Sequence, residues 1–206
     1  MTDTTTPALP PFEFPKIYSF PPLYTEQPNT TIQSQQLDSW TSIILQYCQY
    51  YKITSLTLDL VPKHLQYTHL SLSELPSLFV NKAINRQVGP EFQKKIIAHL
   101  LHLNKAVFVN PKKPQFGIFV LWKSLVEWGN ELYSYVDELG QKGTVLTIYE
   151  LTKSDDEDGG GIGVPDSLVN LDEAFLIRII RDYLIKQGKA QLLIDENNEI
   201  GGVKIV

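Results

Sequence analysis

Two histidines form the pair most suggestive of a metal site in this sequence of 206 residues. His99 and His102 lie one helical turn apart, a spacing at which two imidazoles project from the same face of a helix. A protein zinc site takes at least three protein ligands, and neither a carboxylate nor a further histidine stands at ligand spacing beside the pair. His64 and His69 lie in a segment without a clear structural pattern. The sequence therefore favours no metal and no cofactor.

An acidic run, Asp155–Asp158, precedes the glycine-rich stretch Gly159–Gly163. As a calcium loop the run fails, because the twelfth position, which requires Glu, would be Pro165. As a phosphate loop it lacks the Lys-Ser/Thr ending, and its carboxylates would repel an anion. The composition indicates a solvated, flexible loop.

The single cysteine, Cys48, lies on the apolar stripe of a predicted helix, where a thiol behaves as a small hydrophobic group. A catalytic thiol needs an electropositive, partly exposed setting. Since no nucleophile, base and orienting group can be placed together, we expect a protein that is not an enzyme. A lone cysteine also fits a reducing compartment.

Charge argues against a nucleic-acid binder. The chain has 18 basic and 23 acidic residues and a net charge of -5. Beyond the pairs Lys94–Lys95 and Lys112–Lys113, which we interpret as solvated surface, Lys and Arg are not concentrated as counterion release would require. Its first residues lack the pattern of a secretory signal, and no apolar stretch reaches the roughly 20 residues that span a bilayer. We expect a cytoplasmic protein that reaches membranes through its partners.

Prolines and aromatic residues are concentrated in residues 1–33, which we interpret as an extended partner-binding arm. A polyproline-like backbone loses little entropy on docking, and an aromatic side chain can anchor it in a pocket. We expect Ala at Pro21, Pro22 and Tyr24 to leave the chain folded but detached from its partners. An arm folded back against Trp40 is the alternative. The candidate binding residues are Phe20, Pro21, Pro22, Leu23 and Tyr24, with weaker copies of the motif at Pro10, Pro11 and Phe12 and at Tyr18.

Apolar spacing predicts helices and hairpins in a repeated order. Capping-box pairs stand at Ser71/Glu74 and Ser124/Glu127, and Asn170 with Glu173 is predicted to cap the last helix. The predicted helices cover 37–51, 75–83, 92–104, 125–139 and 171–184; Val145–Tyr149 is predicted as a strand, and hairpins join 106–109 to 116–121 and 191–194 to 203–206.

An internal repeat organises these elements. The segment beginning at Phe92, FQKKIIAHLLHLNKAVFV, aligns with FLIRIIRDYLIKQGKAQLLI beginning at Phe175. A period of roughly 80 residues is too long for a solenoid and indicates two copies of a domain. A helix packed on a terminal hairpin is typical of winged-helix domains. We therefore predict an α+β fold with tandem winged-helix domains at 34–123 and 124–206.

Taken together, these features resemble the smallest subunit of the ESCRT-II endosomal sorting complex. The resemblance extends from about Tyr18 to the C-terminal residue and is weakest between Ile53 and Val88. Its carrying residues are Phe20-Pro21-Pro22-Leu23-Tyr24-Thr25, Gln27-Pro28-Asn29, Gln36-Leu37, Trp40, Leu121-Trp122, Glu127-Trp128-Gly129, Val145 to Thr152 and Leu171-Asp172-Glu173-Ala174.

The resemblance implies two copies of the chain per complex, each joined by its Pro-Pro-x-aromatic arm to a larger winged-helix subunit. It places this role on Pro21, Pro22, Leu23 and Tyr24. It further implies that the second domain recruits and activates an ESCRT-III subunit, so that ubiquitinated cargo enters multivesicular bodies. Some relatives carry a second such motif, but here Pro15-Lys16-Ile17-Tyr18 lacks the second proline.

Two other functions remain open from the residues alone. A DNA-binding winged helix would need base-reading side chains on the helix before the last hairpin, which offers Arg178 and Arg181 but also Asp182 and Ile177. A WW-domain adaptor is the other, because Pro21-Pro22-Leu23-Tyr24 fits the Pro-Pro-x-Tyr ligand pattern.

Overall fold

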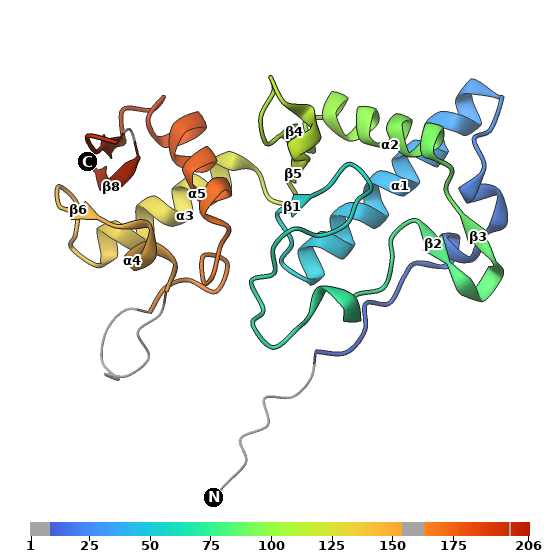
Figure 1. Cartoon of the computed structure of the whole chain (residues 1–206), viewed down its shortest axis with the longest axis horizontal. Helices are drawn as coiled ribbons and strands as arrows, with labels where there is room; N and C mark the ends of the chain where they lie inside the picture. The colour runs from blue at the N-terminus through green and yellow to red at the C-terminus, as the bar shows by residue number, and fades with distance from the viewer. Residues whose placement is uncertain (1–8, 154–162, 198) are drawn as a thin grey trace, which may run out of the picture.

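Two hydrophobic cores, one in each half of the chain, organise the structure (Figure 1). The computed structural model describes residues 9–153, 163–197 and 199–206, so the acidic run predicted as a loop lies outside the described residues. Helices and strands are mixed in both halves, which confirms the predicted α+β class. Within the described ranges no helix is both long and apolar enough to cross a bilayer.

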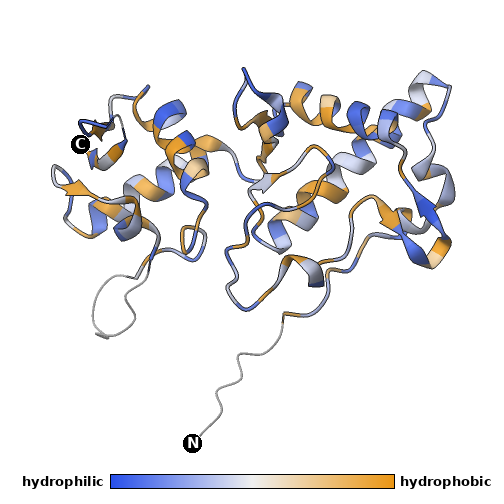
Figure 2. Ribbon diagram, viewed as in Figure 1, coloured by the Kyte–Doolittle hydropathy of each residue, from blue (hydrophilic) through white to orange (hydrophobic). Residues whose placement is uncertain are grey.

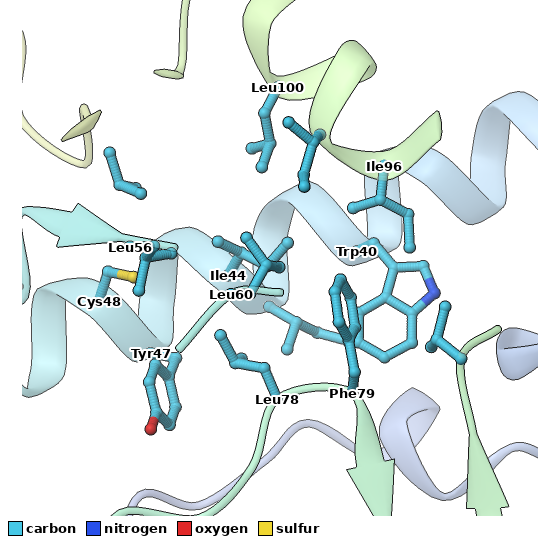
Figure 3. Close-up of a cluster of buried hydrophobic side chains, with 14 of the residues drawn as sticks. Trp40, Ile44, Tyr47, Cys48, Leu56, Leu60, Leu78, Phe79, Ile96 and Leu100 are labelled. Carbon is cyan, nitrogen blue, oxygen red and sulfur yellow. The ribbon is translucent and has the colours of Figure 1, made fainter. Parts of the chain in front are cut away.

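The first core is built between two helices, α1 (Thr30–Tyr50) and α2 (Pro90–His102). Asn29 caps α1, its side-chain oxygen accepting the backbone N–H groups of Thr31 and Ile32. In Figure 3, Trp40 and Ile44 of α1 lie below Ile96 and Leu100 of α2, and other apolar side chains fill the space around them. Both helices also carry polar residues, as the mixed colouring of Figure 2 shows, so each buries one face.

A three-stranded antiparallel sheet completes the first half. Its order is β1 (Ser55–Leu56), β5 (Ile118–Val120), β4 (Ala106–Phe108), with Leu56 opposite Ile118 and Phe108 also opposite Ile118. The helix over 92–104 and the hairpin that follows it are therefore confirmed, with slightly shorter strands than predicted.

The helix predicted over 75–83 is wrong. The capping box of Ser71 and Glu74 forms, but it opens only a 3-10 turn, Leu72–Glu74. Leu75, which precedes Pro76, has an extended backbone, because the proline ring excludes the helical region for the residue before it. The chain continues instead into a small hairpin of β2 (Val80–Asn81) and β3 (Arg86–Gln87).

The second half repeats the order of elements. It contains α3 (Leu125–Glu138), β6 (Val145–Leu146), α4 (Ile148–Thr152), α5 (Glu173–Ile179), a π-helical turn (Ile180–Leu184), β7 (Ala190–Ile194) and β8 (Ile200–Ile205). Its sheet has the order β6-β8-β7, which matches β1-β5-β4 of the first half position by position. The repeat predicted from the sequence is thus visible in the fold, and the capping box of Ser124 and Glu127 forms as predicted.

Two predictions for the second half need correction. The strand predicted over Val145–Tyr149 ends at Leu146, because Thr147 and Glu150 form a capping box that starts α4. The N-cap of α5 is Asp172, whose carboxylate accepts the N–H of Phe175, and not Asn170. Asn170 instead has a left-handed backbone, φ 53°, a conformation that Asn tolerates better than most residues.

Side chains on the two faces of β5 belong to different cores, and this strand therefore joins the two halves. Ile118 and Val120 face the first core, whereas Phe119 belongs to the second core, where its ring lies 5.2 Å from that of Phe175. Arg178 stacks on Phe119 and donates hydrogen bonds to the carbonyl oxygens of Phe108 (2.9 Å) and Val109 (2.7 Å). These contacts make the sheet of the first half a wall of the second core.

The side-chain amide of Gln66 supplies a second link between the halves. It is buried and donates to the carbonyl oxygens of Ser167 and Val169, both at 2.8 Å, while the backbone carbonyl of Gln66 accepts from the side-chain amide of Asn170. These bonds across the junction satisfy carbonyl groups of two half-buried residues, and so they help to orient the two halves.

We therefore predict that Gln66→Ala lowers the free energy of unfolding by about 1–3 kcal/mol, since two carbonyl oxygens lose their donor. Denaturant unfolding followed by tryptophan fluorescence measures it. The matched control is Gln187→Ala, an exposed glutamine, which should change stability little. Equal stability of the Gln66 variant and the control would contradict a linking role for Gln66.

Candidate partner-docking site

The Pro-Pro motif lies within a compact segment of two consecutive 3-10 turns, Lys16–Ser19 and Pro21–Tyr24. The N–H of Tyr18 donates to the Pro15 carbonyl, and that of Leu23 to the Phe20 carbonyl. The predicted extended arm is therefore wrong for residues 16–24. Proline fixes φ near -65°, which suits a 3-10 turn as well as a polyproline helix, so packing decides between them.

The side chains of Gln36 and Trp40 hold this segment against α1. The indole N–H of Trp40 donates to the Leu23 carbonyl at 2.9 Å. The side-chain amide of Gln36 lies within 3.0 Å of the carbonyl oxygens of Pro22, Leu23 and Thr25. Gln36 and Trp40 are one helical turn apart, so both reach the same stretch of backbone.

The buried side chains of Tyr18 and Tyr24 also hold the segment in place. The Tyr24 hydroxyl donates to the Tyr18 carbonyl at 2.6 Å, and the Tyr24 ring meets Trp40 edge to face at 5.5 Å. The Tyr18 hydroxyl donates to the carbonyl oxygen of Ser77, and the Asn81 amide donates to the Tyr18 carbonyl. Burial raises the pKa of both tyrosines above their ordinary value, so both hydroxyls stay protonated as donors.

Six of the nine predicted binding residues belong to the segment of these two turns, and they separate into two kinds. Tyr18, Leu23 and Tyr24 are buried in the first core, and Tyr24 is only 2% exposed. Phe20, Pro21 and Pro22 are exposed, with Phe20 at 55%. The expectation that Ala at Pro21, Pro22 and Tyr24 would leave the fold intact no longer holds, because Tyr24 is part of the core.

The copy of the motif at Pro10, Pro11 and Phe12 lies elsewhere. The Pro10 carbonyl accepts from the Tyr50 hydroxyl, and the Phe12 N–H donates to the Tyr51 hydroxyl. Phe12 is half-buried against Tyr47, at the opposite end of α1 from Gln36. The structure does not bring the two motifs together, and it gives this copy a packing role at the C-terminal end of α1.

The exposed part of the motif borders a hollow of about 360 Å³ at the N-terminal end of α1. We call Ile17, Phe20, Pro22 and Ile32 the Phe20 surface; these four line the hollow together with Leu23, Gln27, Gln35, Gln36 and Ser39. Ile32, which the sequence did not single out, is 50% exposed although it is aliphatic. A cluster of exposed apolar side chains on a fixed backbone is typical of a protein-docking surface.

Two cations adjoin this segment from the β2-β3 hairpin. Asn81, which bonds Tyr18, is paired with Arg86 across the hairpin and is followed by Lys82. Lys82 and Arg86 are exposed, and neither forms an ion pair with a residue that the structure describes. Sequence reasoning missed this hairpin because it predicted a helix there.

The other candidate residues are engaged in packing or surface contacts. His99 lies 2.8 Å from Asp38, and in the described part of the chain no three His, Cys, Asp or Glu side chains gather as metal ligands. Cys48 is buried, which raises the pKa of its thiol. Arg178, a potential base reader, is bound to the first half and to Asp182.

We predict unequal stability effects for two aromatic substitutions in this segment. Tyr24→Ala should lower the free energy of unfolding by about 3–5 kcal/mol, because it empties a core position. Phe20→Ala should change it little, since the ring is mostly in water. Thermal unfolding of the isolated chain distinguishes them, and equal destabilisation by both would refute the division into inner and outer residues.

The comparisons with known proteins agree on one family. A family model described as "ESCRT-II complex subunit" matches residues 17–162. "Vacuolar protein-sorting-associated protein 25" of Xenopus laevis is 32% identical over 193 residues, covering 94% of this chain and 98% of the relative. The human protein of that name is 30% identical, covering 88% and 92%.

Solved structures give the same result. The chain is similar to "Crystal structure of subunit VPS25 of the endosomal trafficking complex ESCRT-II", with a TM-score of 0.75, 28% identity and coverage of 94% and 98%. It is also similar to a chain of "The crystal structure of endosomal complex ESCRT-II (VPS22/VPS25/VPS36)", with a TM-score of 0.71, 28% identity and coverage of 93% and 98%. The family model covers well over half of the sequence, including the Phe20 surface, and the chain belongs to the ESCRT-II complex subunit family.

Proposed function

We propose that this chain is the small assembly subunit of an ESCRT-II complex and docks onto the larger subunits through the Phe20 surface. The observation that carries the proposal is the exposure of Phe20, Pro21 and Pro22 on a backbone held by Gln36 and Trp40. A neighbouring structure contains VPS22 and VPS36 beside VPS25, and we assign their counterparts as the partners here. Two copies of this chain would serve the two larger subunits.

A preformed surface makes docking favourable. The 3-10 turns already order the backbone, so binding loses little conformational entropy beyond that of the Phe20 side chain. A partner that fits would offer an apolar socket for Phe20 and Pro22 and a carboxylate within reach of Arg86. The apolar contact would supply most of the affinity, and the ion pair would mainly select the partner and its orientation.

The buried tyrosine argues against a WW-domain adaptor. A WW domain would bind the Pro-Pro-x-Tyr motif as an extended peptide with its tyrosine available. Here Tyr24 is buried and its hydroxyl donates to the Tyr18 carbonyl, so WW binding would require the first core to open. The engagement of Arg178 likewise counts against DNA reading by α5.

For the second half we propose recruitment and activation of an ESCRT-III subunit, in sorting ubiquitinated cargo into multivesicular bodies at the cytoplasmic face of endosomes. We propose domain limits of 34–123 and 124–206, with the described residues before 34 packed on the first domain. Strand β7, in the second half, is an edge strand of its sheet and carries Leu193 and Ile194, both exposed. An exposed apolar edge strand of this kind suits a protein partner.

The docking prediction concerns Phe20→Asp. A charge in an apolar socket, together with the lost ring, should weaken binding to the larger subunits by about 2 kcal/mol or more, which is about thirtyfold. Co-expression with both larger subunits, purification on a tag carried by one of them and titration of the purified parts measure this. Arg86→Glu should weaken binding less, and more at low salt than at high salt.

The control is Val126→Asp, which places the same charge on an exposed apolar position of α3 and should leave assembly unchanged. If the Phe20→Asp chain is folded by circular dichroism and still assembles like the control, the Phe20 surface is not the docking element.

A separate prediction addresses the second half. Leu193→Asp together with Ile194→Asp should abolish binding of the ESCRT-III subunit, because the edge strand becomes charged, while assembly with the larger subunits persists. Pull-down of the ESCRT-III subunit on the intact complex measures the first effect, and gel filtration the second. Normal recruitment by this double variant would exclude β7 as the recruiting element.

A further inference from the structure

A second exposed apolar surface lies on the first half, where two turns meet. One turn follows β1 and contains Leu58, Val61 and Lys63; the other joins β4 to β5 and contains Lys112, Lys113 and Phe116. Figure 1 shows the connection between β4 and β5 at the top of the first half, on the side toward the second half, with β1 beside β5. We call these six residues the loop patch.

The two turns are fixed to each other. The Lys63 ammonium donates to the Phe116 carbonyl at 2.7 Å. Gly117 has φ 92°, and a Cβ there would lie 2.2 Å from the Leu56 carbonyl oxygen. The second turn therefore lies so close to β1 that only glycine fits at this position.

Apolar side chains protrude from both turns. Val61 is 52% exposed and Phe116 is 47% exposed. An apolar groove of about 530 Å³, lined by Leu58, Pro114 and Ile97 of α2 among others, continues the surface toward that helix. None of these residues belongs to the Phe20 surface, so the docking proposed above leaves the loop patch uncovered.

The charge of the loop patch has the opposite sign to that of the whole chain. Three lysines and the neighbouring Asp59 leave a local charge of +2, whereas the whole chain carries -5. Lys63, Lys112 and Lys113 form no ion pair with any described residue, and Lys113 lies over the Phe116 ring at 5.6 Å. Lysines around a protruding aromatic ring are the combination that binds anionic membrane surfaces.

We propose that the loop patch binds the surface of an anionic phospholipid bilayer, with Phe116 and Val61 entering the interface and the lysines contacting headgroup phosphates. A peptide partner is disfavoured because the turns form their own hydrogen bonds: the Thr57 N–H donates to the Val61 carbonyl, and the Lys112 N–H to the Asn110 side chain. Bilayer contact by this subunit is independent of which protein occupies the Phe20 surface.

Vesicle co-sedimentation of the full chain tests this proposal. We expect binding to vesicles of mixed phosphatidylcholine and phosphatidylserine, and loss of binding when phosphatidylserine is omitted or salt is raised. Lys112→Glu with Lys113→Glu should weaken binding at least about tenfold, since each lysine near an anionic surface contributes about fivefold. Val61→Asp with Phe116→Asp should weaken it further.

The controls carry single changes of the same kind away from the loop patch: Val126→Asp for the apolar variant and Lys186→Glu for the lysine variant, both at exposed positions of the second half. Circular dichroism checks the fold of each variant. If the apolar variant is unfolded, the lysine variant alone tests the proposal. Binding that ignores phosphatidylserine, or a chain that binds neither vesicle, would overturn the proposal. So would a lysine variant that binds like its control.

Discussion

One backbone carbonyl, that of Leu23, connects the partner-docking element to the first core. It accepts hydrogen bonds from the indole of Trp40 and from the amide of Gln36, two donors on adjacent turns of α1. Since Trp40 is buried, losing this acceptor would leave its indole N–H in the core without a partner, whereas Gln36 would keep the carbonyl oxygens of Pro22 and Thr25. The bonds therefore hold the Pro-Pro turn in place even though its outer residues contact solvent.

Because these hydrogen bonds fix its backbone, the segment of the two 3-10 turns has a buried face and an exposed face. Tyr18, Leu23 and Tyr24 point inward and belong to the first core, while Phe20 and Pro22 remain available to a partner. The stability of the fold and the geometry of docking then depend on the same turns. The two halves are also held together, because Phe119 and Arg178 join the sheet of the first half to the second core. A partner at Phe20 and another at the second half would thus meet one connected body.

The sequence predicted helices whose apolar stripe is long and whose cap is local, such as α3 with Ser124 and Glu127. It also predicted the repeated order of elements, because Ile96-Ile97 and Ile179-Ile180 occupy equivalent buried places. It failed where distant contacts decide. Proline sets φ alone, so the residues near Pro21 could not decide between an extended arm and one folded back against Trp40, and they did not indicate the 3-10 turn or the part of Gln36. Asn81 and Arg86 were missed for a local reason, since the pattern after Ser71 favours a helix that Pro76 prevents.

Hydrogen exchange of the isolated chain tests most directly whether the docking element is folded before it meets a partner. The backbone N–H groups of Tyr18, Phe20, Leu23 and Thr25 donate within the 3-10 turns. Our account predicts that these amides, above all that of the buried Leu23, exchange much more slowly than in an unfolded peptide, and that Trp40→Phe, which removes one donor to the Leu23 carbonyl, speeds their exchange. Exchange of all four at the rate of an unfolded peptide in the free chain would contradict it, because the motif would then be the extended arm that the sequence suggests.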